Sequence, residues 1–174
     1  MSRHALLRNN MIQVFGNAYQ AFGLNRVMGH VVAALMFSPE PLSLDEICLQ
    51  LNKSKGPISQ ITRRLVDHNL IRRVWVPGSR KDYYEVHPEI FTNAFRYNFK
   101  LIKHNTIIAK QFKNEVNHTN DETLHALRTR LNEMERFYEL MEENYQQFID
   151  RWETTEKNAS ASSVRLPKKT SKKG

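Results

Sequence analysis

The sequence has few of the residues that build covalent or membrane-spanning structure. It contains one cysteine in 174 residues, so no disulfide can form within the chain, and we expect a reducing, cytoplasmic environment. Cys48 belongs to an apolar helical face, which favours a small core residue over a redox sensor. No segment approaches the roughly 20 apolar residues of a membrane-spanning helix, and no signal peptide is expected.

Sequence patterns of enzymes and metal sites are also missing. There is no Gly-rich phosphate loop, nucleophile elbow or catalytic carboxylate pair. None of the seven histidines stands at metal-ligand spacing from a cysteine or carboxylate partner. We therefore expect no enzyme activity, no metal and no cofactor.

Positive charge is abundant but unevenly distributed. The chain has a net charge of +8 and a pI near 9.7. Residues 157–174 carry six lysines and arginines without an acid, whereas residues 121–156 carry ten acids against four arginines. Between Lys53 and Val86, eight lysines and arginines face three acids. A basic surface confined to one region suits a protein that binds DNA there, because a uniformly basic body would bind everywhere.

The basic region lies within Pro41–Val86, which reads as helix, turn, helix and hairpin. Ser43 followed by Glu46 is a capping box that starts a short helix. Ser54 can cap a second helix, with Pro57 in its first turn. The two strands of the hairpin are predicted over residues 70–76 and 82–86, with the turn at 77–78. A helix-turn-helix followed by a basic hairpin is a winged helix, whose second helix suits the major groove of DNA.

Three stretches resemble the GbsR branch of the MarR-type winged-helix regulators. They are SPEPLSLDEI, SKGPIS and LIRRVWVPGSRKDYYEV, and the similarity is densest from Gly23 to Val86. Asn69 stands where many MarR-type proteins have glycine, and asparagine also tolerates a left-handed helix end. Ser79 stands where an acidic residue often precedes the wing arginine. The resemblance implies a dimeric, DNA-binding transcription regulator, in a branch associated with genes for osmoprotectant uptake or synthesis.

The outer face of the second helix is the main candidate for reading DNA. Its apolar residues at 58, 61 and 65 form a stripe, so the polar residues between them are expected to point outward. Gln60 is suited to adenine, and lysine or arginine to guanine. Arg80 resembles the wing arginine that MarR-type proteins place at the minor groove. The predicted DNA-binding residues are Lys53, Ser54, Lys55, Ser59, Gln60, Thr62, Arg63, Arg72, Arg73, Arg80 and Lys81.

Long helices are predicted on both sides of this region. Residues 5–22 and 26–37 precede it, the second helix being capped by Asn25. After it, residues 88–118 form a helix whose apolar residues recur four and three apart, a coiled-coil seam that also contains Asn98 and Asn105. The last helix has the strongest periodicity of apolar residues. Its apolar seam needs another surface to cover it, and the same helices of a second subunit are the best candidates. The predicted dimerisation residues are Leu124, Leu127, Leu131, Met134, Tyr138, Met141, Tyr145, Phe148 and Trp152.

These patterns predict a mainly α protein, a MarR-like winged helix with a long-helix dimerisation head and a two-stranded β-wing. Residues 1–153 form one domain, in which 23–87 bind DNA and 1–22 and 88–153 dimerise, and 154–174 form a disordered basic tail. The predicted function is sequence-specific regulation of transcription by a homodimer on a pseudo-palindromic operator, with repression favoured over activation. The alternatives are a protein-interaction scaffold and a non-specific architectural DNA binder.

A small effector is a further expectation, implied by the resemblance. Members of the branch suggest a choline- or betaine-like ligand, which a cage of converging aromatic rings would hold. The candidates are Phe91, Phe95, Tyr97 and Tyr138, although their spacing favours core packing. Packing of the wing onto the body is the expected role of Trp75, Tyr83 and Tyr84.

Overall fold

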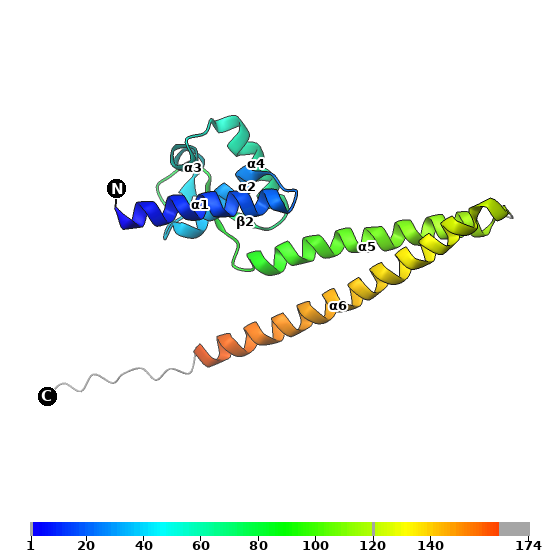
Figure 1. The fold of residues 1–174 in the computed structure, drawn as a ribbon. Helices are drawn as coiled ribbons and strands as arrows, with labels where there is room; N and C mark the ends of the chain where they lie inside the picture. The colour runs from blue at the N-terminus through cyan, green and yellow to red at the C-terminus, as the bar shows by residue number, and fades with distance from the viewer. Residues whose placement is uncertain (1, 120, 164–174) are drawn as a thin grey trace. The chain divides into compact units, whose positions relative to one another are not determined.

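The computed structural model describes residues 2–119 and 121–163 (Figure 1). Its contacts divide the chain into two compact units, Met1–Tyr97 and Asn98–Gly174. We call the first the winged unit and the second the helical unit. Among the described residues, no helix has the length and apolar character to cross a membrane.

The winged unit is built around α2 (Arg26–Phe37), which is buried from Met28 to Leu35. As predicted, Asn25 caps this helix, its side-chain oxygen accepting the amide of residue 27 at 2.8 Å. The N-terminal helix α1 (Arg3–Ala21) packs closely on α2. A Cβ atom on Gly29 would lie 2.4 Å from the backbone oxygen of Phe15, so only glycine permits this close crossing.

Helices α3 (Leu44–Leu51) and α4 (Lys55–Asp67) form the predicted helix-turn-helix. The capping box at α3 is confirmed: Glu46 accepts the backbone amide of Ser43 at 2.7 Å, and the Ser43 hydroxyl accepts the amide of Glu46 at 3.3 Å. The cap on α4 is not as expected, because Ser54 has the extended N-cap conformation but its side chain makes no capping hydrogen bond. The apolar residues of both helices join one core: Met28, Val31, Val32, Leu35, Leu42, Ile47, Ile58, Ile61, Leu65, Leu70, Ile71, Tyr84 and Ile90.

The wing belongs to a three-stranded antiparallel sheet rather than a two-stranded one. Strands β2 (Ile71–Val74) and β3 (Tyr83–Val86) pair as predicted, and β1 (Leu42–Ser43) adds to the other edge of β3. Strand β1 was not predicted, because two residues carry no periodic signal. Asn69 ends the preceding turn with a φ of 54°, the left-handed conformation that its side chain tolerates.

The helical unit consists of the larger part of α5 (Ile90–Asn117), a short 3₁₀ turn η1 (Glu122–Leu124) and α6 (His125–Ser163). The buried stripe of α5 agrees with the predicted seam at Ile102, Ala109 and Val116. It differs at the two asparagines: Asn98 is exposed and Asn105 half-buried, and the next residues along the chain, Phe99 and Thr106, are buried instead. The adjacent positions are buried because α5 faces α6 through pairs such as Phe99 with Tyr145, whose rings stack at 5.9 Å.

The predicted seam of α6 is only partly buried within the chain. Leu131 is 7% exposed, but Leu127 is 45% and Phe148 51% exposed. Several side chains of α6 that contact α5 are carboxylates and not the predicted apolar residues. Glu135 pairs with Lys113 at 2.5 Å and Glu139 with Lys110 at 2.8 Å. Glu142 accepts a hydrogen bond from Thr106. Electrostatic pairing therefore turns an acidic flank of α6 toward the lysines of α5.

The predicted start of the disordered tail at residue 154 is wrong. Helix α6 continues to Ser163, and Thr154 and Thr155 donate their hydroxyls to backbone oxygens one turn earlier. These bonds satisfy the two hydroxyls within the helix, so a Thr-rich composition does not by itself end it. The rest of the predicted tail, 164–174, lies outside the described residues.

Candidate nucleic-acid interface

The outward face of α4 is held in place by its buried side. Ile58 and Leu65 are fully buried, so the helix has one rotational position against the core. Gln60 and Arg63 are exposed, as predicted, and Ser59 is half-buried. The expectation that Thr62 points outward is wrong: it is 1% exposed, and its hydroxyl donates to the backbone oxygen of Ser59 at 3.0 Å. Thr62 can be buried because this bond satisfies its hydroxyl within the helix.

Arg64 is a further exposed residue on α4 that the sequence analysis left out. It lies one turn after Gln60, and residues four apart share a helix face. That spacing was available in the sequence and identifies Arg64 as a member of the same basic surface.

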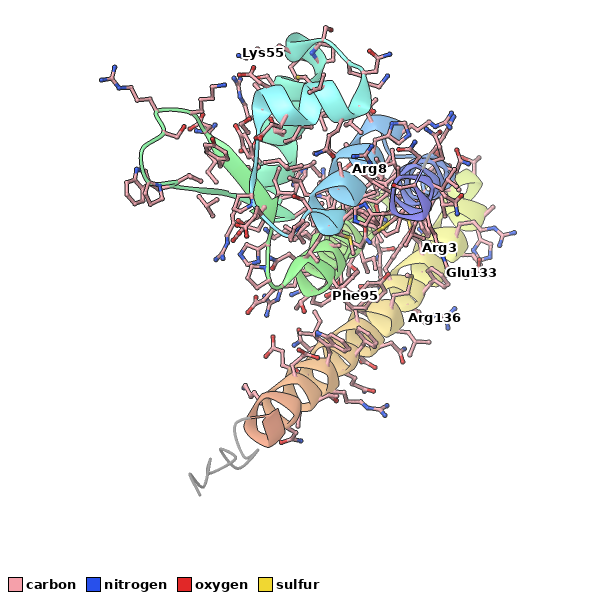
Figure 2. The ribbon with its side chains drawn as sticks, turned by 90° about the vertical axis from the view of Figure 1, so that its left-hand side faces the viewer. Arg3, Arg8, Lys55, Phe95, Glu133 and Arg136 are labelled. Carbon is pink, nitrogen blue, oxygen red and sulfur yellow. The ribbon has the colours of Figure 1, made fainter. Side chains whose placement is uncertain are left out.

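The beginning of α4 is electropositive for two reasons. The Ser54 side chain makes no capping hydrogen bond, so it leaves the first-turn amides available to another acceptor. Lys53 and Lys55 flank this end, and both are exposed. First-turn amides, the helix dipole and adjacent ammonium groups together favour an anion such as a phosphate. Figure 2 shows Lys55 at this end of α4, on the outer surface of the winged unit.

The wing projects from the same unit and presents Arg80 and Trp75. Arg80 is exposed, and Gly78 provides the tight turn with a φ of 79°. Trp75 is 78% exposed, so the expectation that it packs the wing onto the body is wrong. Tyr84, by contrast, is 4% exposed and does belong to the core. Tyr84 lies within β3, where side chains alternate between the two faces of the sheet. Trp75 follows Val74, where β2 ends and this alternation stops.

Two arginines of the wing that were predicted to contact DNA pair with acidic side chains of the wing itself. Arg72 donates to Glu85 at 2.6 Å, as its directly opposite partner on β3. Arg73 lies 3.9 Å from Asp82 and 5.9 Å from the centre of the Tyr84 ring. These pairs stabilise the hairpin and reduce the net charge that the two arginines offer to DNA.

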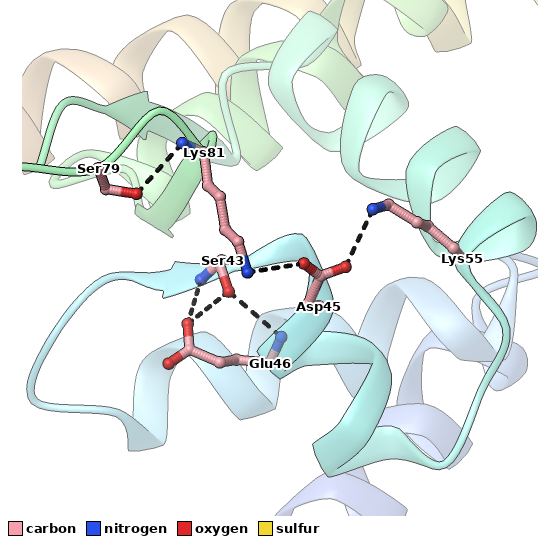
Figure 3. Close-up of polar contacts among 6 residues, drawn as sticks. All are labelled: Ser43, Asp45, Glu46, Lys55, Ser79 and Lys81. Atoms are coloured by element: carbon pink, nitrogen blue, oxygen red, sulfur yellow. Dashed lines mark hydrogen bonds and ion pairs between the residues drawn. The ribbon is translucent and has the colours of Figure 1, made fainter.

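Two further lysines share one carboxylate. The Asp45 side chain, in the first turn of α3, lies 3.0 Å from the Nζ atom of Lys55 through one oxygen and 3.0 Å from that of Lys81 through the other (Figure 3). Hydrogen bonds from these lysines lower the pKa of the Asp45 carboxyl, and the bond to Asp45 raises the pKa of Lys81.

The eight cations between Lys53 and Val86 therefore fall into two groups. Half of them, Lys55, Arg72, Arg73 and Lys81, contact acids. The other four make no ion pair with any residue in 2–119 or 121–163: Lys53, Arg63, Arg64 and Arg80. Cations without an ion-pair partner in the described part of the chain are the groups most ready to neutralise phosphates, and all four lie on α4, just before it or on the wing.

Other predicted sets of residues belong to one unit or are divided between the two. The predicted dimerisation residues belong to the helical unit. The aromatic cage candidates divide between the units, with Tyr138 in the helical unit and the other three in the winged unit. No group of three or more His, Cys, Asp or Glu side chains among the described residues is arranged to hold a metal ion.

Comparison with known proteins supports the function class that the sequence predicts. No family model matches the chain. The chain is 26% identical over 111 residues to the HTH-type transcriptional repressor OpcR of Bacillus subtilis (strain 168), covering 62% of this chain and 60% of OpcR. It is 30% identical over 86 residues to the HTH-type transcriptional regulator MmpR5 of Mycobacterium tuberculosis (strain ATCC 25618 / H37Rv), covering 49% and 52% of the two chains. The chain thus spans less than two thirds of the length of these relatives.

A solved structure bears on the fold. The crystal structure of a transcriptional regulator matches with a TM-score of 0.72 at 22% identity, covering 84% of this chain and 98% of that chain. Together with the observed elements, this confirms the predicted fold class, a mainly α winged helix with long helices.

Proposed function

We propose that this chain is a sequence-specific DNA-binding transcriptional regulator that acts as a repressor. The observation that carries the proposal is the set of unpaired cations on α4 and the wing, presented by a helix-turn-helix whose other face is fully buried. The second helix of such a motif enters the major groove, and the wing contacts phosphates or the minor groove. The similarity to named helix-turn-helix regulators supports the same function.

Within this surface, Gln60 and Arg63 are the proposed base-reading residues. Both are exposed near the middle of the outward face of α4, and their side chains suit adenine and guanine respectively. Lys53, Arg64 and Arg80 are the proposed phosphate or minor-groove contacts, which position the protein without reading sequence. Ser54 and Ser59 are proposed to hydrogen-bond the backbone beside them.

The active form proposed is a homodimer in the cytoplasm. Large apolar side chains stay exposed on the helices of the single chain, and exposed apolar surface marks an interaction site. Examples are Leu7 at 60% and Phe137 at 60%. A two-fold dimer presents two recognition helices to successive major grooves about 34–36 Å apart, so the operator should be pseudo-palindromic.

We further propose that this chain is a member of the GbsR branch of MarR-type regulators. This membership rests on the motif resemblance, and it brings with it an osmoprotectant-related role and a choline- or betaine-like effector. Isothermal titration of the purified protein with choline and glycine betaine tests the effector. Heat release with either compound, abolished by Tyr97→Ala, would support a cage that includes that ring.

A gel-shift titration tests the main proposal. The full chain is titrated against duplex DNA from the region upstream of its own gene and against a random duplex of equal length. We expect tighter binding to the upstream duplex, and Gln60→Ala should relax sequence choice at one base position by about 1–3 kcal/mol. Arg130→Ala is the matched control, since this residue lies on α6 with a side chain 79% exposed and should change neither affinity.

The outcomes separate the alternative functions. Equal affinity for both duplexes would indicate a non-specific architectural protein. Absence of binding to either duplex at low salt would indicate a protein-interaction scaffold and contradict the proposal.

A further inference from the structure

The Asp45 carboxylate joins three different elements of the winged unit. It belongs to the first turn of α3, Lys55 to the start of α4, and Lys81 to the wing. Each lysine approaches a different oxygen of the carboxylate at 3.0 Å (Figure 3). The only ion pairs that the described residues offer to Lys55 and Lys81 are these two.

The neighbouring acid does not share this role. Glu46 accepts both the backbone amide and the hydroxyl of Ser43, at 2.7 and 2.6 Å, and so completes the capping box. An acid in a first turn is favoured by the helix dipole, which explains an acidic residue at position 45 but not its two lysine partners. These partners come from the DNA-facing parts of the molecule, 10 and 36 residues away.

We propose that Asp45 is a specificity-determining residue, which withholds Lys55 and Lys81 from random DNA and holds the wing and the recognition helix in register. This inference rests on the proposed function and names a residue that limits non-specific binding at the same surface. Affinity for random DNA depends on how many phosphates are neutralised. A lysine bound to Asp45 neutralises none until that pair breaks, and the freed carboxylate then repels the backbone.

The operator can open the pairs where random DNA does not. Base contacts by α4 hold the operator backbone in one position beside the lysines, whereas random DNA samples many positions. All three side chains are about half exposed or more, so each pair is screened and weak enough to exchange for a fixed phosphate. The pairs therefore penalise random DNA more than the operator.

The first test measures DNA affinity. Asp45→Asn and the control Asp82→Asn are titrated with operator and random duplexes at two salt concentrations. Both remove one negative charge, but among the described residues the Asp82 carboxylate has one ion-pair partner, Arg73 at 3.9 Å. We expect Asp45→Asn to bind random DNA more tightly, to steepen its salt slope by up to about 1.8 for two added phosphate contacts, and to lower the operator-to-random ratio several-fold.

A rescue variant checks that the lysines cause the effect. Adding Lys55→Gln and Lys81→Gln to Asp45→Asn should return the salt slope on random DNA to the wild-type value. If Asp45→Asn changed both affinities by the same factor as Asp82→Asn, the specificity role would be overturned.

The second test needs no DNA. The pKa of the Asp45 carboxyl is measured by NMR in the wild type and in Lys55→Gln, Lys81→Gln and the control Lys53→Gln. The pKa should rise in the first two variants and stay unchanged in the control; no rise would exclude the shared pairs. If the wild type binds operator and random DNA equally while this pKa responds, the proposed regulator function fails and the Asp45 pairs stand.

Discussion

The two units of this chain satisfy their apolar side chains to different degrees. The winged unit has a continuous core in which Val31, Ile47, Ile58 and Leu65 are fully buried. In the helical unit, α5 and α6 bury a narrow stripe and meet through lysine–carboxylate pairs, while residues such as Ile107 and Leu140 remain about 60% exposed. A helix with large exposed apolar side chains needs another surface to cover them.

This difference separates two sources of stability. The winged unit is held by a core to which its helices and its sheet contribute. The helical unit has fewer buried side chains to stabilise it, and we propose that association covers exposed apolar side chains of both units, such as Leu7 and Leu140.

Dimerisation should be the property most sensitive to change in the helical unit. Replacing the exposed residues Leu127 and Phe137 of α6 with lysine places four charges in a two-fold interface, because each substitution occurs twice. We expect a monomer by analytical ultracentrifugation and weak operator binding. Asn132→Lys, at an exposed polar position of the same helix, is the control. A dimer that survives the double substitution would remove these residues from the interface.

Core truncation should distinguish buried from exposed apolar residues within one short helix. Ile47 is fully buried in α3 and Leu49 is 83% exposed. Ile47→Ala should lower the free energy of unfolding by about 2–5 kcal/mol, from lost burial and the cavity left behind. Leu49→Ala should change it by less than about 0.5 kcal/mol. Urea denaturation measures both, and similar losses would contradict the burial assigned to these side chains.

The close crossing of α1 and α2 should have no room for one added methyl group at Gly29. Gly29→Ala places a Cβ atom 2.4 Å from the Phe15 backbone oxygen, so the helices must separate. Overpacking of this kind costs about 1–3 kcal/mol. Apart from its two chain neighbours, Gly56 has no atom within 4 Å of an added Cβ, so Gly56→Ala should change the free energy of unfolding by less than about 0.5 kcal/mol. Thermal unfolding should therefore shift down for Gly29→Ala and stay near the wild type for Gly56→Ala.

The smallest effect expected is a pH dependence from His30 in the winged unit. Its Nε2 atom is buried without a hydrogen-bond partner among the described residues, and burial lowers its pKa, with Arg26 and Lys53 adding to the shift. Because the unfolded state then binds the proton more readily, stability should be full above about pH 6.5 and fall as the pH decreases through the folded pKa.

The His30→Leu variant tests this assignment. Chemical denaturation at pH 7.5, 6.5 and 5.5 should show a weaker loss of stability on acidification than the wild type shows. His118→Leu, at an exposed position, should keep the wild-type dependence. An unchanged profile in His30→Leu would assign the pH dependence to other groups.

Much of the winged unit could be predicted because its signals are local. The capping box at Ser43, the cap at Asn25 and the left-handed end at Asn69 each depend on residues within one turn. The outward face of α4 was predicted except for Thr62, whose hydroxyl is satisfied by its own helix, and Arg64, which the spacing identifies. The exposure of Trp75 could not be predicted, since strand alternation does not reveal where a strand stops.

By itself, the sequence determined the helix boundaries near their caps, the helix-turn-helix and the basic character of its outer side. Tertiary structure alone decided which lysines meet Asp45, the pairing of β1 with β3, and which flank of α6 faces α5. The physical reason is separation along the chain. A cap or an apolar stripe is complete within a few residues, whereas these contacts join residues 10 to about 40 positions apart and form only once the chain has reversed direction.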